Sequence, residues 1–316
     1  MPGLAFLPAM IRDKIQRAVL RWRLRKERNA LEPLLVLAQG RSGTTLLMQV
    51  LATSPQIAFD RIYPFEVRYL TYLLHWASLL GQASQPQSDW TPFAPPGTRL
   101  GPLPFAETKL WDGQEMWRRC FRAAWREFSQ IAVARMGMEM KRLWNPEVPV
   151  LYYAEKVPNW LPERLRPVMS YKVIILTRDP RDVFLSVIAF DKKRGFPGFG
   201  RLPDEDDWAW ARRFVEYYKV DFRFMQKAQA APSSYLLQYE QLTVNLEAEA
   251  KRLSQWLGVE FDVERVKADL PNFAHHLTSA SPDQSVERWR REMSPELRQF
   301  FQNALGEELR HYGYDA

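Results

Sequence analysis

The chain has few of the side chains that build disulfides and zinc sites. Its 316 residues include one cysteine, Cys120, and four histidines. No intrachain disulfide can form, and no His-x-His or His-x-x-x-His spacing provides a pair of metal ligands. A single cysteine suits a reducing compartment. The sequence therefore predicts a cytoplasmic protein that holds no metal ion.

Long apolar runs are also missing. A membrane-spanning helix needs about 20 mostly apolar residues in a row, and the sequence contains no such run. The opening residues lack the cationic stretch and the cleavage site of a secretory signal. The net charge of +7 is concentrated in residues 1–30, which hold eight Lys/Arg and two Asp/Glu. The rest of the chain is nearly neutral, so a nucleic-acid-binding face is not expected.

Residues 1–30 have apolar side chains at helical spacing with Arg and Lys between them. This pattern predicts a basic amphipathic helix. Such a helix either packs on the protein or makes a peripheral contact with an anionic membrane, and the sequence leaves both open. Residues 31–316 are long enough for one large domain, which we expect them to form.

Short apolar runs alternate with helical patterns along this domain. Leu34–Ala38, Val173–Thr177 and Tyr235–Tyr239 each have the length and composition of a buried strand. Helices are expected over 45–53, 208–230 and 246–257, and another opens at Ser294-Pro295. Two irregular segments are expected, at 81–109 and 191–207. The order predicts an α/β fold with a P-loop-type parallel β-sheet flanked by helices, whose ligands bind at the carboxyl ends of the strands.

The turn after the first strand has the composition of an anion-binding loop. It reads Gly-Arg-Ser-Gly-Thr-Thr and opens a helix, so backbone N–H groups and hydroxyls converge on one point. A nucleoside-triphosphatase loop would have Lys where this chain has Thr44, which disfavours that activity. The candidate ligands are Arg41, Ser42, Gly43, Thr44 and Thr45.

A second anion site is expected at the end of the next strand, in the segment Thr-Arg-Asp-Pro-Arg-Asp-Val-Phe-Leu-Ser. Arg178 lies at the strand tip and Ser186 follows two helical turns later, so both can reach one anion. The alternative is that Arg178 forms a surface ion pair with Asp179 or Asp182.

The arrangement of two such loops on neighbouring strands resembles that of the sulfotransferase superfamily, whose members use 3′-phosphoadenosine 5′-phosphosulfate (PAPS). Ala154–Trp160, Tyr239–Leu242 and Ser285–Trp289 are similar to further segments of that family, in the same order. Arg41 replaces the Lys of the small-molecule cytosolic branch, so the chain more closely resembles the bacterial and tyrosylprotein sulfotransferases.

The resemblance implies roles for individual residues. The first loop would hold the 5′-phosphosulfate, and Arg178 and Ser186 the 3′-phosphate. Tyr239 and Arg288 would contact the phosphates or the adenosine, although Tyr239 could instead be a core aromatic and Arg288 an exposed helix residue. The product would be 3′-phosphoadenosine 5′-phosphate (PAP).

Sulfuryl transfer by in-line displacement requires a base for the acceptor and positive charge at the leaving group. Glu66 is the expected base, with His75 as its rival; alternatively Glu66 only opens a helix. Lys156 and Arg41 are expected to stabilise the leaving group, unless Lys156 pairs with Glu155.

The sequence does not identify the acceptor. A hydroxyl or an amine of a small molecule, glycan, lipid or peptide would serve. Two other functions remain open: a P-loop kinase or nucleoside triphosphatase, and an inactive binding protein on a sulfotransferase fold.

Overall fold

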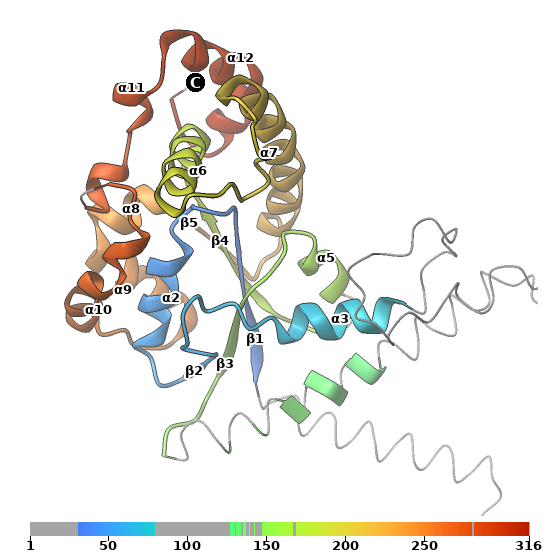
Figure 1. The fold of residues 1–316 in the computed structure, drawn as a ribbon. Helices are drawn as coiled ribbons and strands as arrows, with labels where there is room; N and C mark the ends of the chain where they lie inside the picture. The colour runs from blue at the N-terminus through green and yellow to red at the C-terminus, as the bar shows by residue number, and fades with distance from the viewer. Residues whose placement is uncertain are drawn as a thin grey trace, which may run out of the picture.

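The computed structural model describes residues 31–79, 147–166, 169–279 and 281–315, with some residues between 127 and 142. A five-stranded sheet forms the centre, in the order β2-β3-β1-β4-β5, and every strand pairing is parallel (Figure 1). The strands are β1 (Glu32–Ala38), β2 (Ile57–Ala58), β3 (Tyr152–Lys156), β4 (Lys172–Thr177) and β5 (Ser234–Gln238).

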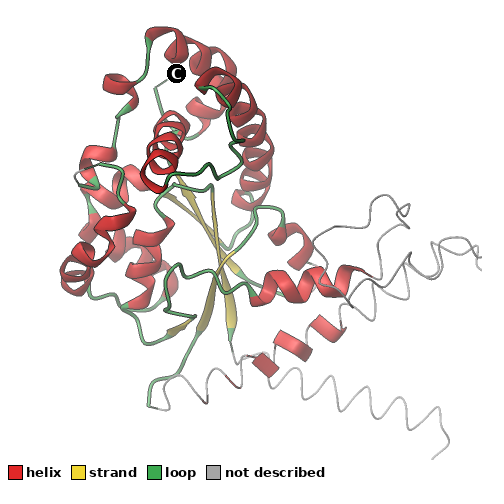
Figure 2. Ribbon diagram, in the orientation of Figure 1, coloured by secondary structure: helices red, strands yellow, loops and turns green. Residues whose placement is uncertain are grey.

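Helices cover both faces of this sheet, which confirms the predicted α/β fold (Figure 2). The α-helices discussed below are α2 (Thr44–Ala52), α3 (Tyr69–Leu79), α5 (Leu161–Leu165), α6 (Pro180–Arg194), α7 (Asp207–Gln229), α8 (Tyr239–Val244), α9 (Leu246–Leu257), α10 (Val263–Asp269), α11 (Trp289–Glu292) and α12 (Pro295–His311). Two 3₁₀ segments, η3 (Leu270–His276) and η4 (Asp283–Ser285), join α10 to α11.

The strands read as continuous apolar runs because both sides of the sheet are buried. Alternate residues point to opposite faces. Leu34 and Ile174 belong to the core shared with α2, α9 and α10, whereas Leu35 and Val173 belong to the core shared with α3, α5 and α7. All four side chains are fully buried. The two cores fix β1 between β3 and β4, so the turns that follow β1 and β4 lie side by side.

A third apolar cluster joins α6, α7, α11 and α12 beyond the edge of the sheet. Phe184, Trp210, Phe214 and Phe301 form its aromatic centre. Ser294 caps α12 by accepting a hydrogen bond from the Leu297 amide, as predicted. This packing holds the C-terminal region against α6, and therefore beside the end of β4.

Some expected boundaries were wrong. The segment 191–207 begins in helix, because α6 continues to Arg194 and ends where Gly195 adopts a left-handed conformation. Tyr239 opens α8 rather than ending β5. The predicted helix over 1–30 and the irregular segment 81–109 lie outside the described residues. In the described part of the chain, no helix is long and apolar enough to cross a bilayer.

Candidate active site

The turn between β1 and α2 adopts the backbone conformation expected of an anion-binding loop. Arg41 and Gly43 have φ values of +70° and +90°, which turn successive peptide groups toward the start of α2. Gly43 is required here for a second reason. A Cβ atom at this position would lie 2.1 Å from the Tyr239 ring. Thr44 and Thr45, the first residues of α2, line the adjoining cavity.

The turn between β4 and α6 lies directly beside the first loop. Asp179 caps α6 and forms a 2.7 Å ion pair with Arg181, so it is not the partner of Arg178. The Arg178 side chain is buried and donates to the carbonyl oxygens of Arg41, at 2.8 Å, and Ser285, at 2.7 Å. Its guanidinium carbon lies 4.5 Å from the centre of the Tyr239 ring. The alternative, in which Arg178 forms a surface ion pair, is therefore wrong.

One donor of Arg178 remains unused. Its Nε atom is buried and has no hydrogen-bond partner among the described residues. Leaving a buried cationic donor unpaired costs free energy, so an acceptor that paired with this group would stabilise it.

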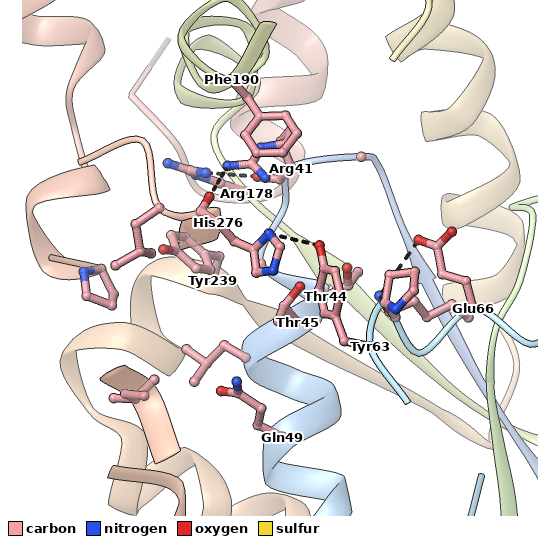
Figure 3. Close-up of a pocket in the computed structure, with 18 of the residues that line it drawn as sticks. Arg41, Thr44, Thr45, Gln49, Tyr63, Glu66, Arg178, Phe190, Tyr239 and His276 are labelled. Carbon is pink, nitrogen blue, oxygen red and sulfur yellow. Dashed lines mark hydrogen bonds and ion pairs between the residues drawn. The ribbon is translucent and has the colours of Figure 1, made fainter. Parts of the chain in front are cut away.

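Arg41 connects the two loops. Its Nε donates to Ser186 Oγ at 3.2 Å and its Nη2 donates to the His276 carbonyl oxygen at 2.8 Å. Its guanidinium carbon stacks 4.2 Å from the centre of the Phe190 ring (Figure 3). Burial, and then the neighbouring charge of Arg178, lower the pKa of Arg41 to about 10. The side chain therefore stays protonated at neutral pH.

The C-terminal candidates are buried and tied to the same network. Arg288 is only 5% exposed, so it is not a solvated helix residue. Its guanidinium pairs with Glu292 and donates from Nη1 to Thr278 Oγ1 at 3.0 Å. Thr278 also lies 3.3 Å from Ser186 Oγ. A chain of polar contacts thus runs from Arg41 through Ser186 and Thr278 to Arg288.

Glu66 and Lys156 lie together at another side of the same cavity. Lys156 Nζ is 3.9 Å from Glu66 Oε1 and donates to the Pro64 carbonyl oxygen at 2.8 Å. Glu66 is half-exposed and also pairs with Arg68 at 3.4 Å. Burial lowers the pKa of Lys156 to about 8. The Glu66 carboxylate and the Lys156 ammonium group, whose proton affinity is reduced, therefore lie at the same side of the cavity.

The alternative in which Lys156 pairs with Glu155 is wrong. Glu155 points to the opposite face of β3, where it is buried and accepts hydrogen bonds from the Leu70 amide and from Thr71 and Tyr153. Alternation along a strand sends adjacent side chains to opposite faces, which frees Lys156 for the cavity.

These residues surround a cavity of about 430 Å³, which is within the range of small-molecule sites. It is lined by both halves of the predicted site, and its lining includes Arg41, Gly43, Thr44, Thr45, Glu66, Lys156, Arg178 and Tyr239. Ser42, Ser186 and Arg288 are buried behind or beside this lining. Among the described residues, no three His, Cys, Asp or Glu side chains are arranged to hold a metal ion.

The comparison with protein families shows which family the chain belongs to. The model of the family described as the sulfotransferase family matches residues 33–263. The chain belongs to the sulfotransferase family. The comparison with curated proteins gives no match.

Solved sulfotransferase structures share the fold. The sulfotransferase domain from the curacin biosynthetic pathway is 17% identical, with a TM-score of 0.51 over 90% of this chain and 98% of that one. The sulfotransferase domain of the Synechococcus PCC 7002 olefin synthase is 16% identical, with a TM-score of 0.50 over 90% and 97%. A mouse sulfotransferase, SULT7A1, complexed with PAP is 15% identical, with a TM-score of 0.45 over 89% and 84%. At these identities, the first two likenesses concern the fold alone.

The surroundings of the cavity also include contacts that the sequence did not predict. Tyr63 stacks on His276, with ring centres 4.0 Å apart, and its hydroxyl lies 2.8 Å from His276 Nδ1. Ser285 hydrogen-bonds the Tyr239 hydroxyl at 2.8 Å. The partners in the first pair are 213 positions apart, so no local pattern predicts their contact. The side chain of His75, the rival base, lies outside the described part of the molecule.

Proposed function

We propose that this sulfotransferase transfers the sulfuryl group of PAPS to a hydroxyl or an amine of its acceptor. The observation that carries the proposal is the junction of two anion-binding loops at one cavity, with Arg178 Nε buried and unpartnered between them. PAPS has phosphate-like groups at both its 5′ and 3′ positions. A site with two separate sets of cationic and backbone donors suits that arrangement better than a site for one phosphate chain.

The first loop and the start of α2 would hold the 5′-phosphosulfate of PAPS. Arg178, Ser186 and Arg288 would hold its 3′-phosphate, with Tyr239 beside them. Arg41 is assigned to both groups. Its backbone forms the first loop, whereas its guanidinium reaches Ser186 in the second.

Glu66 would accept the proton of the acceptor while the acceptor oxygen or nitrogen bonds to sulfur. The bond between sulfur and the bridging phosphate oxygen breaks in the same displacement, and PAP leaves with the negative charge. Lys156 would stabilise this charge, with Arg41 as a second cation. The 3.9 Å separation of Glu66 and Lys156 supports this division of roles, because the entering atom and the leaving oxygen are both bonded to the same sulfur in the displacement and so lie close together.

The test is transfer of ³⁵S from labelled PAPS to a panel of phenols, glycans, lipids and peptides. We expect label in at least one acceptor class with the wild-type protein. Glu66→Gln should lower the rate by about 10²- to 10⁴-fold, the usual contribution of a general base. Glu163→Gln is the matched control, because Glu163 is exposed on α5 and pairs with Lys227 away from the cavity. Equal rates for wild type and Glu66→Gln would refute the role of Glu66.

Two other outcomes would favour a different function for the protein. Transfer of ³²P from ATP without any sulfuryl transfer would indicate a kinase. Binding of PAP with no transfer to any acceptor would favour a binding protein on this fold.

A further inference from the structure

The cavity extends past the phosphate loop along the side of α2. Leu46 and Gln49 line this extension from α2, and Leu270 and Pro271 line it from η3. The helix periodicity places Gln49 one turn beyond Thr45, about 6 Å further along α2. A ligand whose phosphates bind at the start of α2 would therefore extend its next portion between these apolar side chains.

Gln49 is a polar residue in this part of the cavity whose amide nitrogen has no hydrogen-bond partner among the described residues. The residue is 6% exposed, and its Nε2 atom is buried without a hydrogen-bond partner among the described residues. Figure 3 shows the side chain projecting from α2 among the residues that line the cavity. A buried amide of this kind lowers stability unless something pairs with it.

Lys267, which also lines this part of the cavity, already has ion-pair partners. Its Nζ atom pairs with Glu247 at 2.6 Å and with Glu264 at 2.8 Å. These two carboxylates compensate its charge at the surface, whereas no hydrogen-bond partner in the described part of the chain pairs with the Gln49 amide nitrogen.

We propose that Gln49 recognises the nucleobase of the sulfuryl donor, PAPS, by hydrogen bonding. This inference rests on the proposed function, since it assumes that a nucleotide occupies the cavity. A glutamine amide has an amino group that donates beside a carbonyl oxygen that accepts, and adenine presents a ring nitrogen beside its 6-amino group. Leu46 and Leu270 would contact the faces of the base, which leaves its polar edge for Gln49. The residue is thus a specificity determinant for adenine.

Calorimetric titration with two nucleotides tests the proposal. The first is PAP, and the second is the same bisphosphate with unsubstituted purine, which lacks the 6-amino group. The wild-type protein should bind PAP about tenfold more tightly, as expected for a lost hydrogen bond in a buried site. In Gln49→Leu this preference should disappear, because the pairing group is absent from the protein.

Thermal unfolding without ligand provides a second readout. Gln49→Leu keeps the size of the side chain and removes an unpartnered amide, so its midpoint should equal or exceed that of the wild type. Gln299→Leu is the matched control, because Gln299 is exposed on α12 and should leave the preference for PAP unchanged.

The outcomes separate this inference from the proposed function. If both nucleotides bind, Arg178→Ala weakens both, and Gln49→Leu retains the tenfold preference, the role of Gln49 is refuted while the nucleotide site stands. If the wild type binds neither nucleotide, the proposed function fails and the role of Gln49 fails with it.

Discussion

Single side chains explain why two loops form one site. Arg41 belongs to the first loop by sequence, yet its guanidinium contacts Ser186 and the His276 carbonyl oxygen. Arg178 belongs to the second loop, yet it donates to the Arg41 carbonyl oxygen. Each arginine therefore stabilises the loop that it does not belong to. Loss of either side chain should therefore remove a contact between the two loops.

The lowered pKa of Lys156 predicts how activity depends on pH. Its pKa is lowered to about 8 by burial, so the free enzyme loses this positive charge as the pH rises through 8. Because a neutral amine stabilises the leaving group poorly, kcat/KM for PAPS should fall above about pH 8. Lys156→Arg keeps the charge at all accessible pH values and should move this decline upward. A pH profile of kcat/KM for both proteins is the measurement, and an identical alkaline decline would contradict the role of Lys156.

At the scale of elements, the conformation of the first loop depends on Gly43. An added methyl group meets both an unfavourable φ of +90° and the Tyr239 ring. Gly43→Ala should therefore destabilise the fold by about 2 kcal/mol or more and abolish PAP binding.

Gly258 is a matched control for this substitution. It ends α9 with a φ of +69°, but an added Cβ would meet no atom within 4 Å from the rest of the described structure beyond its chain neighbours. Gly258→Ala should cost only about 1 kcal/mol from the backbone conformation, with PAP affinity unchanged. Urea unfolding and PAP titration measure both effects. Equal losses of stability in the two variants would show that the Tyr239 contact has no effect.

The ends of β4 and β5 are linked by Glu240, which adds a pH dependence to stability. Its carboxylate accepts from the Asp179 amide at 2.9 Å and from the Tyr314 hydroxyl at 3.1 Å. Desolvation is the main reason that its pKa rises to about 7. The unfolded chain releases this proton near pH 4.3, so the folded state binds it more tightly. The resulting stabilisation is fully present below about pH 4.3 and is lost as the pH rises through about 7.

Glu240→Gln should remove this part of the pH dependence. The decrease in the thermal midpoint between pH 5 and pH 8 should be smaller in the variant than in the wild type. Glu163→Gln, at an exposed position, should leave the decrease unchanged. The same decrease in Glu240→Gln as in wild type would mean that this carboxyl group does not titrate in the range.

Sequence patterns predicted the strands and turns that depend on residues close together in the sequence. The strands β1 and β4 are uninterrupted apolar runs, and the glycines and capping residues mark the turns that follow. The strand β3 was not predicted, because Glu155 and Lys156 read as surface residues. Glu155 is in fact buried, and it accepts hydrogen bonds from the Leu70 and Thr71 amides and the Thr71 hydroxyl of a distant segment. Such hydrogen bonding is visible only once the chain has folded.

At the scale of the whole molecule, the site is assembled from segments far apart in the sequence. The first loop, β3, β4 and the region 276–288 each contribute to it, and helix packing around α6 holds the last of these in place. The sequence predicted which residues belong to the two loops, since each loop is continuous. It did not predict that Tyr63 meets His276 or that Thr278 bridges Ser186 to Arg288. These contacts follow from the tertiary packing.

The most direct test of the bisphosphate site is a calorimetric titration of the wild type and Arg178→Ala with PAP and with adenosine 5′-phosphate. Arg178 is a buried cation with an unused donor, so the wild type should bind PAP at least tenfold more tightly than the monophosphate. In Arg178→Ala that advantage should be lost, while the weaker binding of the monophosphate persists. Equal affinity of the wild type for the two nucleotides would contradict a site built for two separate phosphate groups.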